Sequence, residues 1–122
     1  MWPHENIPDS AAVFMRVHKT YFVEGYLIPG AFRDHGGGMS VDWDRYSTAE
    51  ETKNRARRPE DNGVVALPVS GVRSVEGLTV LHDPATENRA HTQVMGEKDE
   101  ERRLKLSRIY TWQIHLAPEA MD

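Results

Sequence analysis

The chain has 122 residues, 39% of them hydrophobic and 28% charged, with a formal net charge of −4 and no cysteine. This length suits a single domain over 1–122, and the absence of cysteine excludes disulfides, thiolate zinc sites and cysteine nucleophiles. The acidic balance argues against nucleic acid as the main partner. No apolar run approaches the roughly 20 residues that span a bilayer, and the N-terminus lacks a basic segment followed by an apolar one, so we expect a cytoplasmic protein that does not contact membranes.

The chain begins with a segment of little pattern and then an extended one. Residues 1–9 include two prolines and are interpreted as a loose lead-in. Phe14–His18 alternates in polarity and is rich in β-branched and aromatic side chains, which favours a strand. A capped helix over 11–20 is the alternative that the pattern leaves open.

Turns and short strands are expected to follow. Lys19–Glu24 predicts a turn of helix that glycine stops at position 25. Tyr26–Phe32 is typical of an extended segment, broken at its proline and glycine. The next six residues, 33–38, end in three adjacent glycines and predict a flexible loop. Met39–Trp43 alternates with period two and predicts a short strand.

The middle of the chain combines a surface helix with a buried strand. Ser47 and Glu50 have the spacing of a capping box, and the helix that they begin should end before Pro59. The apolar run Val64–Val69 predicts a buried strand. A helical turn is expected over 70–76.

The last third contains two short strands and the best helical pattern. Leu78–Leu81 and Ala90–Met95 predict strands joined by a polar connection. Glu97–Arg108 has acids in its first turns and bases in its last ones, which suits a helix. Residues 109–116 fit either a final strand or a continuation of that helix.

Together these segments predict an α+β fold with a small mixed, mainly antiparallel sheet of four to six strands and two or three packed helices. The expected core consists of apolar side chains from most of the predicted elements: Phe14, Val17, Phe22, Leu27, Phe32, Val41, Val65, Leu67, Val80, Val94, Leu104 and Trp112.

Candidate ligand-binding residues concentrate in the first third of the chain. On a strand, Arg16 and His18 point the same way, about 7 Å apart at their Cα atoms. An arginine fork fits phosphate or carboxylate, and a histidine transfers protons near neutral pH, so the pair suits an anionic ligand. Arg33 precedes the glycine loop, although that loop lacks the GxxxxGK[ST] pattern of a P-loop. A polar strand face and a plain turn are the competing interpretations.

A second constellation surrounds the polar connection near residue 82. His82, Asp83 and His91 would supply enough protein ligands for a catalytic metal if the flanking strands paired. The sequence has no HxH or HExxH spacing, so a turn and a hydrogen-bonded strand histidine are the simpler interpretation. A metal is therefore not favoured.

The order of short motifs resembles a group of small uncharacterised bacterial proteins over roughly 13–96, and this resemblance implies a compact domain without implying a reaction. The motifs are Arg16-x-His18, Gly25, Ala31-Phe32-Arg33, Met39-Ser40-Val41, the 64–69 strand, Asp83-Pro84 and Ala90-His91. Met39 replaces the leucine usual in that group.

A fainter resemblance is to ADP-ribosyltransferase-type domains. Those use an arginine or histidine on an early strand, for which Arg16 or His18 would stand, and a serine or tyrosine on a later one, for which Ser40 would stand. Gln93 occupies the late strand where that family has a glutamate. The resemblance therefore implies NAD binding without the transfer reaction.

The absence of a complete catalytic signature, including GxSxG, favours a binding or accessory module that acts through a protein partner. The alternative is a nucleotide or NAD site. In that alternative Arg16 and Arg33 hold phosphate oxygens, and His18 and Ser40 are the candidate catalytic residues. The loop of Gly36, Gly37 and Gly38 closes over the ligand. The sequence leaves open whether the protein is an enzyme, which ligand or partner it binds, and its oligomeric state.

Overall fold

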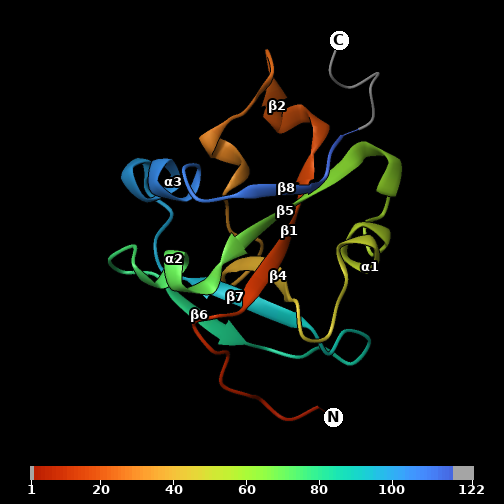
Figure 1. Ribbon diagram of the computed structural model, residues 1–122, viewed down its shortest axis with the longest axis vertical. Helices are drawn as coiled ribbons and strands as arrows, with labels where there is room; N and C mark the ends of the chain where they lie inside the picture. Colours follow the sequence, from red (N-terminus) through yellow and green to blue (C-terminus); the bar gives the residue numbers. More distant parts are fainter. Residues whose placement is uncertain (1, 117–122) are drawn as a thin grey trace.

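The computed structural model describes residues 2–116, and their main feature is a six-stranded sheet. Its strands are β1 (Ala12–His18), β4 (Met39–Trp43), β5 (Asn62–Pro68), β6 (Thr79–His82), β7 (His91–Met95) and β8 (Thr111–Ile114). They lie in the order β6-β7-β4-β1-β5-β8, and every neighbouring pair is antiparallel (Figure 1). A separate two-stranded sheet pairs β2 (Phe22–Val23) with β3 (Tyr26–Leu27). The predicted α+β class with a mainly antiparallel sheet is confirmed.

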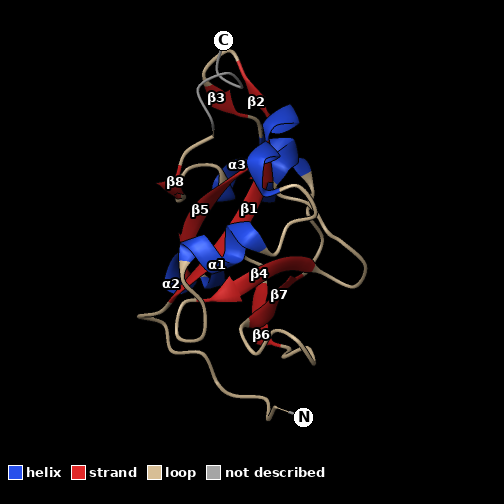
Figure 2. Ribbon diagram, turned by 90° about the vertical axis from the view of Figure 1, so that its right-hand side faces the viewer, coloured by secondary structure: helices blue, strands red, loops and turns tan. Residues whose placement is uncertain are grey.

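Helices flank the main sheet on both sides. The α-helices are α1 (Ala49–Asn54), α2 (Val69–Arg73) and α3 (Glu100–Leu106), and the 3-10 helices are η1 (Lys19–Tyr21), η2 (Pro29–Ala31) and η3 (Pro59–Asp61). In Figure 1 the sheet is seen nearly edge-on, with α1 on one side and α2 and α3 on the other, while Figure 2 shows α1 in front of the sheet. We call the side that α1 covers the α1 face.

The hydrophobic core lies on the opposite face of the sheet. Strand alternation sends Val13, Met15 and Val17 of β1 to this side, where each is at most 3% exposed. Leu106 of α3 and Phe32 after η2 are fully buried in the same cluster. Two packed layers thus bury one side of the sheet and leave part of the α1 face for polar side chains.

Nine of the twelve predicted core residues are buried in the core cluster or pack against it, and three are not. Phe14 points to the α1 face, and Phe22 lies outside the cluster. Leu104 is 39% exposed, whereas Leu106 is 0% exposed. The two residues point to nearly opposite sides of a helix, so the packing of α3 buries one at the expense of the other.

The predicted helical turn over 19–24 is shorter than expected. The His18 side chain accepts a hydrogen bond from the Thr20 backbone N–H and caps η1, after which the chain forms β2. Glu24 and Gly25 have φ values of 51° and 87°, the positive values at both central positions that a type I′ hairpin turn requires. A tight hairpin therefore replaces most of the helical turn.

The first α-helix, α1, begins one residue later than the sequence suggested. The capping box consists of Thr48 and Glu51, while Ser47 is buried and contacts Thr52 instead. The hydrogen bond from the Thr48 backbone N–H lowers the pKa of the Glu51 carboxyl. The helix starts one residue later than predicted because the buried Ser47 hydroxyl is hydrogen-bonded elsewhere, which leaves Thr48 as the cap.

The other helix and strand boundaries also follow from local contacts. The carboxylate of Asp99 accepts a hydrogen bond from the Arg102 backbone N–H, so α3 begins at Glu100 rather than at position 97. Residues 109–116, which the sequence left open, contain the edge strand β8.

The N-terminal segment, predicted as a loose lead-in, has no helix or strand over residues 2–7 and contacts the domain at a few residues. Ile7 is 4% exposed and belongs to the core cluster. His4 Nδ1 donates to the His82 carbonyl oxygen at 2.8 Å, and the Glu5 backbone N–H donates to His82 Nδ1 at 3.0 Å. Across residues 2–116, none of the helices is long and apolar enough to cross a membrane.

Candidate functional site

The α1 face presents polar side chains from three adjacent strands. Alternation in β1 places Arg16 and His18 on this face. The β4 residues Ser40 and Asp42 share it, because Phe14 lies opposite Asp42 in the β1–β4 register. His91 of β7 lies opposite Asp42 and therefore points to the same side.

These strands form one wall of a cavity of about 500 Å³. This volume lies within the range of small-molecule sites. Loops and α1 complete the walls. The lining residues are Phe14, Met15, Arg16, His18, Tyr21, Ala31, Arg33, His35, Met39, Ser40, Val41, Asp42, Thr52, Arg55, Asn62, Asn88 and His91. The cavity thus brings together four residues that the sequence singled out for ligand binding and catalysis: Arg16, His18, Arg33 and Ser40.

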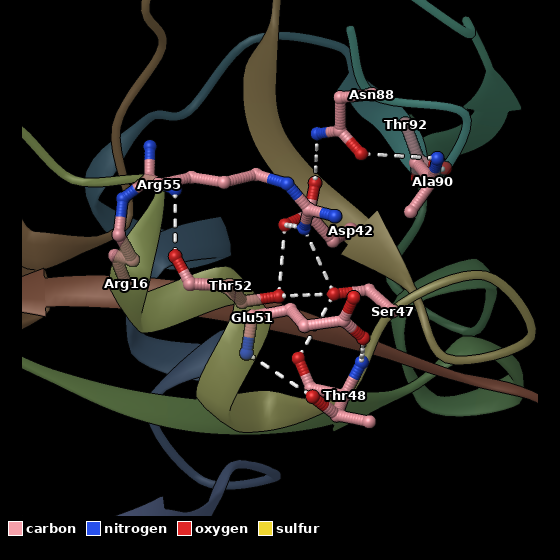
Figure 3. Close-up of polar contacts among 10 residues, drawn as sticks. All are labelled: Arg16, Asp42, Ser47, Thr48, Glu51, Thr52, Arg55, Asn88, Ala90 and Thr92. Carbon is pink, nitrogen blue, oxygen red and sulfur yellow. Dashed lines mark hydrogen bonds and ion pairs between the residues drawn. The ribbon is translucent and has the colours of Figure 1, made fainter.

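The Arg16 guanidinium is held beside α1. One of its terminal nitrogens donates to the Thr52 carbonyl oxygen at 3.0 Å, as Figure 3 shows. Desolvation lowers the pKa of Arg16, while the nearby Asp42 carboxylate raises it and Arg55 lowers it. The group still carries its charge near neutral pH, because the ordinary pKa of arginine lies far above that range. Its remaining N–H groups suit the oxygens of an anion.

Asp42 anchors one side of the cavity through three hydrogen bonds to its carboxylate (Figure 3). Its Oδ2 accepts from the Thr52 hydroxyl and from an Arg55 terminal nitrogen, both at 2.8 Å. Its Oδ1 accepts from the Asn88 side-chain amide at 2.8 Å. Because Asp42 is only 4% exposed and fully partnered, it orders α1 and the β6–β7 connection around the cavity.

Arg33 and His18 reach the cavity from the connections after η2 and at the end of β1. Arg33 donates to the Tyr21 hydroxyl at 2.6 Å. The Thr20 backbone N–H donates to His18 Nδ1, so the neutral ring carries its proton on Nε2 and offers it as a donor. Arg33 and His18 therefore both add hydrogen-bond donors to a cavity that already holds Arg16.

Ser40 and His91 are close to each other on the α1 face. Their Oγ and Nε2 atoms are 3.4 Å apart, and His91 Nδ1 lies 2.7 Å from the Asp83 carbonyl oxygen. A carbonyl only accepts, so Nδ1 carries the proton and Nε2 has its lone pair free for the serine hydroxyl. The sequence identified Ser40 and His91 separately but did not predict that they pair.

The three glycines of the loop do not line the cavity, although the preceding His35 does. The loop is a tight turn in which the His35 backbone N–H donates to the Gly38 carbonyl oxygen at 2.8 Å. A Cβ on Gly38 would lie 2.7 Å from Gln93 Oε1, so this glycine permits close packing against β7. The expected ligand contacts of Gly36, Gly37 and Gly38 are thus not part of the site's geometry.

The alternative metal ligands do not meet as a group of three: Asp83 lies beside His91, but His82 points away from both. Both ring nitrogens of His82 are occupied, Nδ1 by the Glu5 backbone N–H and Nε2 by the Arg89 carbonyl oxygen at 2.7 Å. His82 lies opposite Thr92 in the sheet, so its side chain points away from the face of His91. Among the described residues, no group of three or more His, Cys, Asp or Glu side chains is arranged to hold a metal ion.

Several cavity residues were missed at the level of sequence: Asp42 as an anchor, Thr52, Arg55, Asn62 and Asn88. The alternation of β4 already indicated that Asp42 and Ser40 share a face. No local pattern indicates that α1, predicted as a surface helix, would place Arg55 against the Asp42 carboxylate. This contact depends on how α1 packs on the sheet.

No protein-family model, curated protein or solved structure matches this chain.

Proposed function

We propose that the cavity on the α1 face binds a phosphate-bearing small molecule of nucleotide size, such as NAD or a mononucleotide. The observation that carries this proposal is the shared lining of one cavity by Arg16, His18, Arg33 and Ser40. Guanidinium groups bind phosphate oxygens through paired hydrogen bonds, and the imidazole and hydroxyl add further donors.

The charge of the cavity differs from that of the whole protein. The chain has a formal net charge of −4, but the cavity is lined by three arginines and one carboxylate, Asp42. That carboxylate is paired with Arg55 at 2.8 Å, which leaves Arg16 and Arg33 as the uncompensated charges of the lining. A concave positive site in an acidic protein concentrates anionic ligands there.

The remaining walls suit the uncharged part of such a ligand. Phe14, Tyr21, Met39 and Val41 contribute apolar or aromatic surface to the cavity. Small-molecule sites typically combine an apolar wall with a few polar groups that fix orientation. The cavity has this composition, with its volume of about 500 Å³.

Calorimetry and thermal unfolding with inorganic phosphate, AMP and NAD test the proposal. A ligand at 100 times its Kd should stabilise the protein by about 2.7 kcal/mol and raise the Tm. Arg16→Gln and Arg33→Gln should each remove most of that stabilisation. Arg57→Gln is the matched control, because Arg57 is exposed and does not line the cavity. Equal ligand stabilisation in all three variants, or none in the native protein, would refute the proposal.

We also propose, as a second candidate, an accessory role through a protein partner. The feature that favours it is the β2–β3 hairpin, where Val23 is 46% and Tyr26 is 76% exposed. Exposed apolar side chains on a projecting hairpin are typical of contact surfaces. Affinity capture from a host extract should recover a partner that is lost with Val23→Ser/Tyr26→Ser. Recovery of the same proteins with both versions would argue against this role.

A further inference from the structure

We infer that Ser40, His91 and Asp83 form a nucleophilic relay in this cavity, which transfers a phosphoryl group from a phosphate ester to the Ser40 hydroxyl. The inference rests on the proposed phosphate site, to which it adds a reaction. The relay is built from three elements: Ser40 from β4, His91 from β7, and Asp83 from the connection after β6.

The sheet register places the serine and the histidine diagonally on one face. Ser40 lies opposite Gln93 and Asp42 lies opposite His91, so Ser40 and His91 are diagonal neighbours across the β4–β7 pair. The distance of 3.4 Å between Ser40 Oγ and His91 Nε2 is at the long end of hydrogen-bond reach. Such contacts are often loose in unliganded proteins and tighten when the substrate binds.

A hydrogen bond at Nδ1 of the His91 ring fixes the tautomer that a general base requires. His91 Nδ1 donates to the Asp83 carbonyl oxygen at 2.7 Å. The carboxylate of the same residue places Oδ2 at 3.7 Å from Nδ1, where its charge stabilises an imidazolium. His91 is therefore oriented to accept a proton at Nε2.

Gln93 positions the carboxylate of the relay. Its side-chain nitrogen donates to Asp83 Oδ2 at 2.7 Å, which fixes the acid beside His91. The amide oxygen of Gln93 is buried and has no hydrogen-bond partner among the described residues. It lies against Gly38, where any side chain would collide with it.

The donors of the cavity suit the charge that develops on a phosphoryl group under attack. Arg16 and Arg33 line the same cavity as Ser40, and the His18 ring offers its Nε2 proton. Fixed donors of this kind stabilise the equatorial oxygens of a phosphoryl transition state.

The proposed reaction has two balanced steps. Ser40 Oγ attacks phosphorus, the Oγ–P bond forms, and the bond from phosphorus to the ester oxygen breaks. The hydroxyl proton passes to His91 Nε2 and then to the departing alcohol. In the second step His91 takes a proton from water, the hydroxide attacks phosphorus, the Oγ–P bond breaks, and the proton returns to Ser40 as inorganic phosphate leaves.

Labelling with an alkyl fluorophosphonate tests the nucleophile without requiring the phosphate site. The probe forms an Oγ–P bond and loses fluoride, and mass spectrometry of peptides locates the adduct. We expect the adduct on Ser40. The His91→Gln variant should label at least about 100-fold more slowly, as expected for loss of a general base. Ser70→Ala is the matched control, because Ser70 is an exposed serine on α2, and this variant should label like the native protein.

The pH dependence of labelling separates a base from a structural contact. The native labelling rate should rise with pH and then level off, and this rise should vanish in His91→Gln. Asp83→Asn keeps the backbone carbonyl but loses the carboxylate, so it should slow labelling while the rise with pH remains. Circular dichroism establishes that each variant is folded. The inference is overturned if folded native protein labels Ser40 no faster than Ser70, or if His91→Gln leaves the rate unchanged.

Turnover of p-nitrophenyl phosphate and bis(p-nitrophenyl) phosphate tests the substrate class. Release of nitrophenol that Ser40→Ala abolishes supports phosphoryl transfer. Labelling of Ser40 in a protein that neither binds inorganic phosphate nor hydrolyses these esters would overturn the phosphate-ester substrate together with the proposed function. Phosphate binding without Ser40 labelling would overturn the relay and leave the proposed function standing.

Discussion

The Lys98 ammonium lies 2.8 Å from the Asp34 carboxylate, although only 2% of the lysine side chain is exposed. Its other two protons are directed to the carbonyl oxygens of Val94 at 2.9 Å and Gly96 at 2.6 Å. A buried ammonium is tolerated because every donor has an acceptor and one of the acceptors carries the opposite charge. This contact joins the loop before β4 to the turn after β7, and both segments flank the strands that carry Ser40 and His91.

Lys98→Met should lower the free energy of unfolding by about 2 kcal/mol, because two carbonyl oxygens lose their partner in a buried place. Lys105→Met is the matched control. Lys105 is 47% exposed at its side chain and pairs with Glu101 at 3.3 Å, so its loss should cost less than about 0.5 kcal/mol. Urea unfolding at pH 7 compares the two variants. Similar losses in both would mean that the buried contacts of Lys98 contribute little.

Asp42→Ala should destabilise the fold by about 3 kcal/mol, because the substitution leaves the buried Thr52 hydroxyl and the half-buried Arg55 guanidinium without their acceptor. Asp44 lies in the turn directly after β4 and is exposed. Asp44→Ala should therefore change stability by less than about 0.5 kcal/mol. Denaturant midpoints measure both effects, and a loss for Asp42→Ala no greater than that for Asp44→Ala would contradict the anchoring role.

Gly38→Ala should cost about 1–3 kcal/mol through overpacking. A Cβ at this position would lie 2.7 Å from Gln93 Oε1 and 2.8 Å from Met95 Sδ. The neighbouring Gly37 offers a control, since its Cβ would approach Gln93 Oε1 no closer than 3.6 Å. Thermal unfolding of the two alanine variants should therefore place Gly38→Ala well below Gly37→Ala in Tm. The opposite order would show that the loop packs differently against β7.

Tyr46→Phe should raise the pKa of Glu5 toward its ordinary value. The Tyr46 hydroxyl donates to Glu5 Oε2 at 2.6 Å, and this hydrogen bond is the main cause of the lowered pKa of Glu5. Because the folded-state pKa is depressed, the stabilisation is fully present above the unfolded pKa near 4.5 and is lost as pH falls through the folded value. The native protein and Tyr46→Phe should therefore differ most in stability near pH 7 and converge in acid.

Nuclear magnetic resonance titration of the Glu5 carboxyl measures this shift directly. An unchanged Glu5 titration in Tyr46→Phe would assign the shift to Arg45 and Arg89 instead, whose charges also lower it.

The elements that could be predicted from the sequence are those in which local preference and burial agree. Three predicted segments coincide with strands of the main sheet to within a few residues: Phe14–His18, Met39–Trp43 and Val64–Val69. Each segment either alternates in polarity or is continuously apolar. The predicted helical turn over 19–24 is present only over 19–21, because the rest of the segment enters the β2–β3 hairpin and its turn at Glu24 and Gly25. In that segment the local sequence pattern is compatible with both a helical turn and a β-hairpin.

Individual residues of the candidate site could be predicted from the sequence, but their meeting in one cavity could not. Arg16 and His18 share a face because they are two positions apart on a strand, a relationship that the sequence contains. Arg33 and Ser40 were singled out from their neighbours on the chain, and their common cavity with Arg16 follows from the fold.

The α+β class, the principal strands and the chemical types of side chain available for a site could be predicted from the sequence, because these depend on periodicity and composition within short segments. Only the tertiary structure decided which of those side chains meet. Asp42 met Arg55 through the docking of α1, and Ser40 met His91 through the register between β4 and β7. Register and docking are fixed by the burial of the opposite, apolar face, and a shift of one residue would turn every one of these polar side chains to the other side of the sheet.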